Sequence, residues 1–221
     1  MSRSLPSSIN QIPTPALVLD RAALDGNIAR MAAFFASGPC RLRPHFKAHK
    51  TPEIAKRQLA AGSCTGLTCA TVGEAEIAAG FCDDILLANE IVTPEKCARV
   101  AALARRVRVT TAVDSLAGLE TLSRAASEGS VRIGVLVDLN VGQGRCGVEP
   151  GEAALTLARQ AAQSACIELP GVKGYEGHLQ PVRDRGEREL RTRQAMQGLM
   201  HTAKQIRDAG LPWEIVSAGG T

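Results

Sequence analysis

The chain has 221 residues, of which 45% are hydrophobic, 22% charged and 3% aromatic, with a formal net charge of +4. This is the composition of an ordinary globular protein with one sizeable core. One Trp and one Tyr provide no stacking platform for bases, and the basic residues are scattered, so the composition argues against a nucleic-acid partner. A mild positive charge suits a small phosphate-bearing molecule better.

The cysteines and the apolar segments indicate a compartment. None of the seven cysteines is spaced C-x-x-C, which favours reduced thiols over a disulfide framework or a zinc site. The first twenty residues lack a cationic start followed by a long apolar run, and no stretch reaches the roughly 18 apolar residues of a membrane span. We therefore expect a cytoplasmic protein without membrane association.

Short apolar runs alternate with longer amphipathic segments along the chain. This pattern predicts an N-terminal segment with one strand in residues 1–20, then an α/β domain with a parallel sheet over 21–221. Either a doubly wound sheet or a (β/α)8 barrel would account for it. The predicted strands are 15–19, 42–47, 66–70, 84–88, 107–113, 131–139, 172–177 and 213–217, and the predicted helices are 21–36, 52–61, 72–80, 94–105, 115–128, 151–165 and 186–209.

Polar residues at the predicted strand ends favour a TIM-type barrel, because barrel active sites are built at the carboxyl ends of the strands. The alternative is that strand ends meet solvent and carry polar residues anyway. Without 15–19, seven candidate strands remain, one short of closure. The polar residues are His45, Lys47, Asn89, Asp114, Asp138, Asn140, Tyr175, His178 and Ser217.

Residues 41–52 place one lysine where an aldehyde cofactor could be held. With the period of two that a strand imposes, Arg43, His45 and Lys47 share one face. A helix start follows, which leaves Lys50 in the connecting loop. Lys47 is therefore the better candidate for a positioned amine, and the alternative is that it is one more surface charge.

Residues 142–147, Gly-Gln-Gly-Arg-Cys-Gly, match the G-x-G-x-x-G fingerprint of dinucleotide-binding proteins. In that fingerprint the last glycine lies within the helix that the turn opens. Here residues 148–151 intervene before the predicted helix, and the match comes late in the chain. We interpret the motif as a turn without a dinucleotide, although a nucleotide-binding oxidoreductase stays a third possibility.

The chain ends in a strand that runs into glycines, Ser217-Ala-Gly-Gly-Thr221. Such turns expose backbone N–H groups and can cradle a phosphate. Tyr175, the one tyrosine, lies in a predicted strand, where core packing is the commoner role.

Several segments together carry a family resemblance. They are 14–20, 43–50, 52–55, 73–75, 84–85, 88–90, 113–115, 141–148, 175–178 and 216–221. These segments resemble the fold-type III pyridoxal-phosphate enzymes of the alanine-racemase-like fold, and within them the D-threonine aldolase and D-serine dehydratase family. They follow the family's order across nearly the whole chain, and the R-P-H-x-K-x-H-K block with the later G-x-G-R-C-G-V is specific.

The resemblance implies site residues and a cofactor. It implies that Lys47 is catalytic and forms the Schiff base with pyridoxal 5'-phosphate, with His45 beside it. Arg145 is expected at the pyridine ring, where its charge would disfavour protonation of the ring nitrogen, and Tyr175 is expected to line the cofactor. The phosphate cradle would include Ser217, Gly219, Gly220 and Thr221.

The resemblance also implies a reaction. We expect a lyase that acts on D-β-hydroxy-amino acids by retro-aldol cleavage to glycine and an aldehyde, as D-threonine aldolase does. The alternatives are dehydration of D-serine or D-3-hydroxyaspartate and, from another class, a non-enzymatic pyridoxal-phosphate-binding protein. Substrate identity stays open, because aldolase relatives tend to carry a Gln-Lys pair where this chain has 68–72. A homodimer is expected.

In the family, the chain continues past the glycine-rich loop to a last barrel strand and a β-domain with the metal ligands, usually a His with an Asp or a Cys. We therefore expect an incomplete barrel whose own residues supply no metal ligand. A divalent metal (Mn, Mg or Zn) is expected for the full-length enzyme, and little or no activity for this chain alone.

Overall fold

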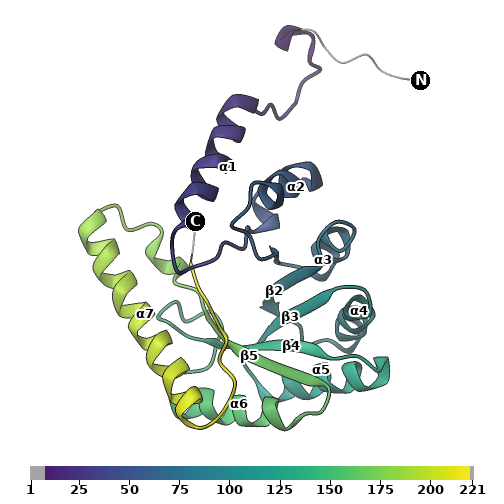
Figure 1. The fold of residues 1–221 in the computed structure, drawn as a ribbon, viewed down its shortest axis with the longest axis vertical. Helices are drawn as coiled ribbons and strands as arrows, with labels where there is room; N and C mark the ends of the chain where they lie inside the picture. The colour runs from purple at the N-terminus through teal and green to yellow at the C-terminus, as the bar shows by residue number, and fades with distance from the viewer. Residues whose placement is uncertain (1–7, 220–221) are drawn as a thin grey trace.

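The computed structural model describes residues 8–219 as an α/β fold. Six strands form one parallel sheet in the order β1-β2-β3-β4-β5-β6, and Figure 1 shows α2 to α7 fanned around the outside of this curved sheet. The strands are β1 (Leu67–Cys69), β2 (Asp84–Glu90), β3 (Arg108–Val113), β4 (Ile133–Leu139), β5 (Ile167–Gly174) and β6 (Ile215–Ser217).

Helices connect successive strands, as parallel pairing requires. The α-helices are α1 (Arg21–Ala36), α2 (Pro52–Ala60), α3 (Val72–Ala78), α4 (Pro94–Ala104), α5 (Leu116–Gly129), α6 (Glu152–Gln163) and α7 (Arg185–Asp208), and the 3₁₀ helices are η1 (Ile9–Gln11), η2 (Phe46–Ala48) and η3 (Gly177–Leu179). The predicted alternation of strands and helices is thus confirmed. Within residues 8–219, no helix is both long and apolar enough to cross a membrane.

The sheet packs its outer face against the helices and turns its other face to the inside of the curve. β4 is buried along its whole length. Ile133, Val135 and Val137 belong to the core cluster shared with the helices, so the alternation of side chains directs Leu136 and Asp138 to the inner face. Polar groups on the inner face of β4 and β5 therefore lie inside the curve of the sheet.

The sheet is curved but open. Among the described residues, β1 and β6 each pair with one neighbouring strand, and near β1 only isolated bridges join Leu42 to Cys64 and His45 to Thr68. The structure therefore shows a sheet that curls part of the way round, and closure into a barrel is not seen in residues 8–219.

The strand predicted at 15–19 is wrong. These residues form no regular element, and Leu17 is fully exposed. A strand needs a neighbour to bond its backbone groups, and no described strand pairs with this segment.

The strand predicted at 42–47 is also wrong in its second half. The segment makes one bridge at Leu42 and one at His45 and then turns into η2 at Phe46. Pro44 has no N–H to donate to a ladder, which limits the pairing here to single bridges.

The strand predicted at 172–177 starts and ends earlier, as β5 over Ile167–Gly174. In the sequence, Pro170 interrupts the pattern of a strand, so the first half of β5 was not predicted. The register with β4 shifts beside it, between the pairs Gly134–Glu168 and Leu136–Gly171. Irregularities of this kind are where a strand accommodates proline. Tyr175 therefore follows the strand instead of lying in it.

We expect Gly171→Ala to lower the free energy of unfolding. Gly171 has φ +153, and a Cβ there would collide with the carbonyl of Ile215 in β6. Relieving that overlap would separate β6 from β5, at a cost of roughly 1–3 kcal/mol. Urea denaturation followed by circular dichroism measures the change.

The matched control is Gly198→Ala in α7, where an added Cβ has no heavy atom within 4 Å apart from those of the chain neighbours and of the backbone of its own helix. Because alanine favours a helix over glycine, this variant should gain up to about 1 kcal/mol. A Gly171→Ala protein as stable as the wild type would contradict the close β5–β6 approach.

Candidate functional site

Three of the predicted site residues lie at or just after the carboxyl ends of strands. Tyr175 directly follows β5, Arg145 lies on the turn after β4, and Ser217 is the last residue of β6. Gly219, with φ +106, lies two residues beyond. Gly220 and Thr221 fall outside the described residues.

The ring of Tyr175 brings two cations together. The Lys47 Nζ atom lies 6.0 Å from the ring centroid, and the Arg145 guanidinium carbon lies 5.6 Å from it. The Gln180 side-chain amide donates to the phenol oxygen at 3.3 Å. Three residues from distant segments thus converge, and Tyr175 serves as a contact surface for cations and not as core packing.

Lys47 reaches this cluster from η2 and not from a strand. It is exposed, whereas the preceding Phe46 is 1% exposed and anchors the turn in the core. The Arg43 guanidinium is bound 2.8 Å from an Asp84 carboxylate oxygen. The prediction that Arg43, His45 and Lys47 share one strand face is therefore wrong, because the chain leaves the extended conformation after His45.

His45 holds the start of η2. Its Nδ1 atom accepts the backbone N–H of Lys47 at 3.3 Å, which requires the neutral imidazole. Burial, followed by the positive charge of Lys47, lowers the pKa of His45 from 6.5 to about 4. His45 is thus uncharged at neutral pH, and its contact in the structure is with the backbone of the lysine turn.

The Gly142–Gly147 motif forms a turn that opens no helix. Val148 returns to pair with Leu139, and α6 begins only at Glu152. Gly147 has φ +95, and a Cβ there would lie 2.6 Å from the backbone nitrogen of Asn140. The interpretation of this motif as a turn and not as a dinucleotide fingerprint is confirmed by this geometry.

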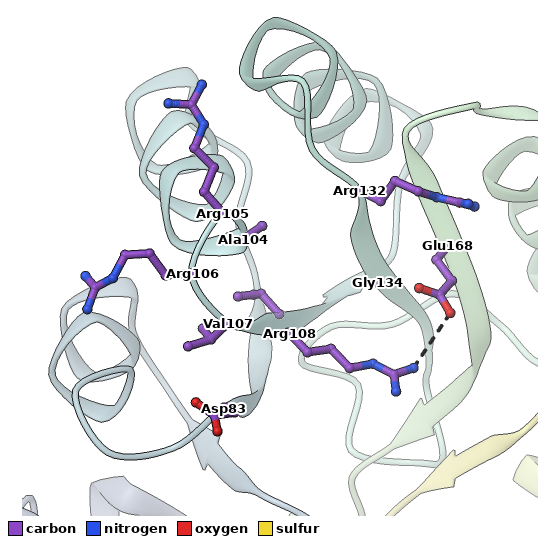
Figure 2. A pocket seen from close by; sticks show the side chains of 10 residues that line it. Asp83, Ala104, Arg105, Arg106, Val107, Arg108, Arg132, Gly134 and Glu168 are labelled. Atoms are coloured by element: carbon purple, nitrogen blue, oxygen red, sulfur yellow. Dashed lines mark ion pairs between the residues drawn. The ribbon is translucent and has the colours of Figure 1, made fainter.

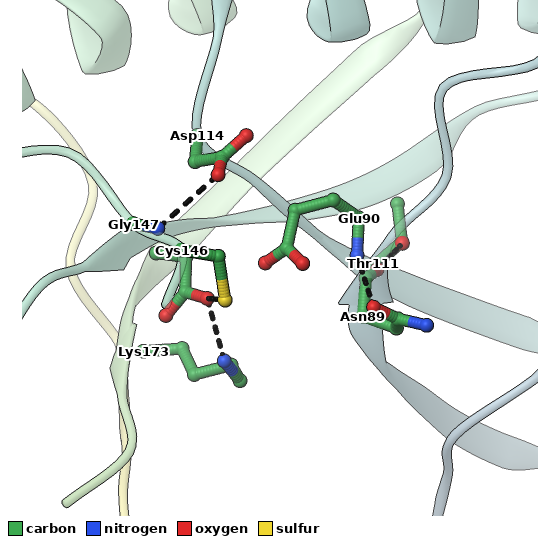
Figure 3. Close-up of polar contacts among 8 residues, drawn as sticks. Asn89, Glu90, Thr111, Asp114, Cys146, Gly147 and Lys173 are labelled. Atoms are coloured by element: carbon green, nitrogen blue, oxygen red, sulfur yellow. Dashed lines mark hydrogen bonds and ion pairs between the residues drawn. The ribbon is translucent and has the colours of Figure 1, made fainter. Parts of the chain in front are cut away.

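A buried polar cluster lies behind this turn, on the inner face of the sheet (Figure 3). The Lys173 ammonium is 2.7 Å from an Asp138 carboxylate oxygen, with the two side chains 9% and 3% exposed. The Cys146 thiol lies 3.8 Å from the same oxygen. Figure 3 shows the Glu90 carboxyl group directed toward Cys146.

The sequence analysis did not identify Glu90 or Lys173 as site candidates. Burial, and then the nearby Asp138, raises the pKa of Glu90 from 4.5 to about 7. Its Oε1 atom is buried without a hydrogen-bond partner among the described residues. A charged residue inside an apolar run, such as Asp138 in β4 or Lys173 in β5, is the signal that could have identified the cluster.

The positive charge of Lys173 offsets the negative charge of Asp138 within the cluster. Glu90, Asp138 and Cys146 are the one group of three possible metal ligands in residues 8–219, with donor atoms within 4.8 Å of one another. Lys173 already neutralises Asp138. The arrangement suits an ammonium ion paired with a carboxylate, so we do not assign a metal to it.

A basic pocket of about 370 Å³ lies at the opposite end of the strands. Figure 2 shows its arginine side chains pointing in different directions. Arg108 is 3.7 Å from Glu168, and Arg105 donates to the carbonyl of Gly129. These guanidinium groups do not converge on one point, which distinguishes the pocket from the cluster around Tyr175.

We expect the stability of the protein to fall as pH rises through the titration of Glu90. Between pH 4.5 and about 7, the folded protein keeps a proton on Glu90 that the unfolded chain releases. Each pH unit in this window therefore costs at most about 1.4 kcal/mol. Glu90→Gln removes the titrating group, so its free energy of unfolding should fall less over the same window.

Urea denaturation at several pH values measures both slopes. Glu128→Gln, which changes an exposed carboxyl on α5, is the control and should keep the wild-type slope. Equal slopes for Glu90→Gln and the wild type would contradict a proton held on Glu90.

The sequence of the chain as a whole is similar to the sequences of known proteins. D-threonine aldolase of Arthrobacter sp. is 40% identical over 213 residues, covering 96% of this chain and 56% of the relative. 3-hydroxy-D-aspartate aldolase of Paracoccus denitrificans is 34% identical over 214 residues, covering 96% and 55%. The chain therefore spans about half the length of the curated relatives it matches.

Solved structures share the fold. The crystal structure of D-threonine aldolase from Filomicrobium marinum has a TM-score of 0.94 and 39% identity, covering 96% of this chain and 58% of that chain. D-threo-3-hydroxyaspartate dehydratase from Delftia sp. HT23 has a TM-score of 0.88 and 29% identity, covering 96% and 56%. A family model, alanine racemase N-terminal domain, matches residues 19–221. With the parallel sheet and the lysine turn at its carboxyl ends, this match shows that the chain belongs to the alanine racemase N-terminal domain family.

Proposed function

We propose that this chain is the cofactor-binding part of a pyridoxal-phosphate-dependent lyase that acts on D-β-hydroxy-amino acids. The convergence of Lys47 and Arg145 on the ring of Tyr175 carries this proposal. A primary amine for covalent attachment, a fixed cation and an aromatic surface are what an anionic aromatic aldehyde requires.

The described residues fit such a cofactor by their charge. Neither Lys47 nor Arg145 has a carboxylate within ion-pair distance in residues 8–219. Two unpaired cations on one ring leave a positive site that an anionic ligand would neutralise. The mild excess of basic residues over the whole chain acts in the same direction.

Each residue has a distinct role in this proposal. Lys47 would hold the cofactor covalently, and Arg145 would keep a positive charge at the ring and so disfavour protonation of a nearby nitrogen. Tyr175 would line the cofactor, and His45 would support Lys47 through its backbone. Ser217 and Gly219, with Gly220 and Thr221 outside the described part, would contribute to a phosphate cradle.

The bound cofactor would supply an aldehyde for the amine of Lys47 and an electron-accepting ring that stabilises negative charge at the substrate Cα. The residues of this chain bind and orient it. The β-hydroxyl of the substrate would be positioned by a divalent metal (Mn, Mg or Zn) whose ligands we place in the part of the relatives that this chain does not span.

The relatives favour aldol cleavage over dehydration as the reaction. The three relatives at 40%, 34% and 35% identity carry the names of aldolases, whereas D-threo-3-hydroxyaspartate dehydratase of Delftia sp. is 32% identical. We therefore propose retro-aldol cleavage to glycine and an aldehyde. We also propose a cytoplasmic homodimer in which residues 21–221 form an incomplete barrel.

We expect Lys47→Ala to abolish covalent attachment of the cofactor. Wild-type protein mixed with pyridoxal phosphate should show a visible absorption band, and borohydride should then fix the cofactor to the peptide that contains Lys47. Absorption spectra and peptide mass spectrometry measure this. Lys50→Ala, which removes a neighbouring exposed amine, should behave as the wild type. Labelling of Lys47→Ala at wild-type level would contradict the assignment.

The reaction can be identified with one substrate. Cleavage of D-threonine gives glycine and acetaldehyde, whereas its dehydration gives 2-oxobutanoate and ammonia. For the protein extended to the length of its relatives, we expect metal-dependent formation of glycine and acetaldehyde in equal amounts. Formation of 2-oxobutanoate would identify a dehydratase. This chain alone should form neither product at a comparable rate.

A further inference from the structure

The turn over residues 141–148 carries Arg145 to the ring of Tyr175. The Arg145 guanidinium lies over that ring, with 5.6 Å between the guanidinium carbon and the ring centroid, and its side chain is exposed. Its position therefore depends mainly on the backbone of the turn. Within residues 8–219, backbone pairing ties this turn to the sheet at its far end, through the bridge between Leu139 and Val148. The backbone around Arg145 therefore depends on side-chain hydrogen bonds.

Asn140 closes the turn with one side chain. Its Oδ1 atom accepts the backbone N–H of Gly142 at 3.1 Å and that of Gly144 at 2.9 Å. Its Nδ2 atom donates to the Glu149 carboxylate at 2.8 Å. The amide thus bonds the first part of the turn, at Gly142 and Gly144, and also Glu149, which follows the turn.

Asp114 adds an anchor on the other side of Arg145. Its Oδ2 atom accepts the backbone N–H of Gly147 at 3.1 Å, as Figure 3 shows. Arg145 therefore lies between the N–H groups held by Asn140 and the one held by Asp114. The two anchors come from the carboxyl ends of β4 and β3.

From these contacts we infer that Asn140 is a positioning residue, whose side-chain amide holds Arg145 against Tyr175 without touching the cofactor itself. The inference deepens the proposed function and rests on it only for what Arg145 does to a bound cofactor. An amide is suited to this role because it accepts and donates at once. An aspartate would keep the acceptor but would face Glu149 with a like charge.

The single tyrosine of the chain makes the position of Arg145 measurable without cofactor. Labelling with meta-fluorotyrosine gives one fluorine NMR signal, which reports the surroundings of the Tyr175 ring. Arg145→Ala should move this signal, and that change defines the reference. Asn140→Ala should move it in the same direction and by most of the same amount.

A charge exchange tests the role more sharply than removal of the side chain. Asn140→Asp alone should displace the signal, because two carboxylates then face each other. Asn140→Asp combined with Glu149→Gln should return it to the wild-type position, since donor and acceptor have exchanged places. Asn89→Asp in β2 is the control. Asn89 bonds Ala70 and Glu90 and makes no bond to the turn, so this variant should leave the signal unchanged.

Cofactor affinity provides the second measurement. Asn140→Ala should weaken binding of pyridoxal phosphate by the same factor as Arg145→Ala, about tenfold for one lost charge-assisted contact. Circular dichroism establishes that each variant is folded. If Asn140→Ala does not fold, the double variant Asn140→Asp with Glu149→Gln still tests the inference.

Three results would overturn the inference. The first is an unchanged signal in Asn140→Ala alongside a displaced one in Arg145→Ala. The second is a paired exchange that fails to restore the wild-type signal. The third is an Arg145→Ala protein with the wild-type signal, which would remove the contact itself. Failure to bind pyridoxal phosphate would refute the proposed function while leaving the signals of the free protein as the test of Asn140.

Discussion

The parallel register of β4 and β5 is the constraint on which the site depends. Leu139 lies opposite Gly174, so the residues that follow, Asn140 and Tyr175, leave the sheet side by side. Because both strands run in the same direction, the turn after β4 and the loop after β5 emerge at one edge. Arg145 can then reach the ring of Tyr175, whereas an antiparallel pair would separate them by the length of a strand.

The same register places a buried ion pair beneath the site. Asp138 lies opposite Lys173, and both point to the inner face, where their charges satisfy each other at 2.7 Å. Breaking a buried pair by removing one partner is costly, because the remaining charge has no partner. The register of β4 and β5 therefore determines which charges surround Glu90 and Cys146. These two residues lie directly behind the turn that carries Arg145.

Local patterns predicted the elements well where they reflect the period of a helix or a fully buried strand. The helix at 21–36 and the strand around β4 were found in this way. Lys47 was selected from the pattern of residues 41–52, the cofactor roles of Arg145 and Tyr175 came from the family resemblance, and the three side chains converge. The pattern failed at 42–47, where Pro44 limits pairing, and at 15–19, where an apolar run has no strand beside it. Glu90 carries no local signal, because its proton is held by burial and by Asp138.

The sequence by itself determined the order of strands and helices, and therefore a parallel sheet with polar residues at its carboxyl ends. Only the tertiary structure decided which of those residues meet. Lys47 arrives on a 3₁₀ turn anchored by Phe46, and Arg145 on a turn held by Asn140 and Asp114. The physical reason is that side-chain hydrogen bonds and burial between segments far apart in the chain fix the position of each turn, and local propensity does not contain these contacts.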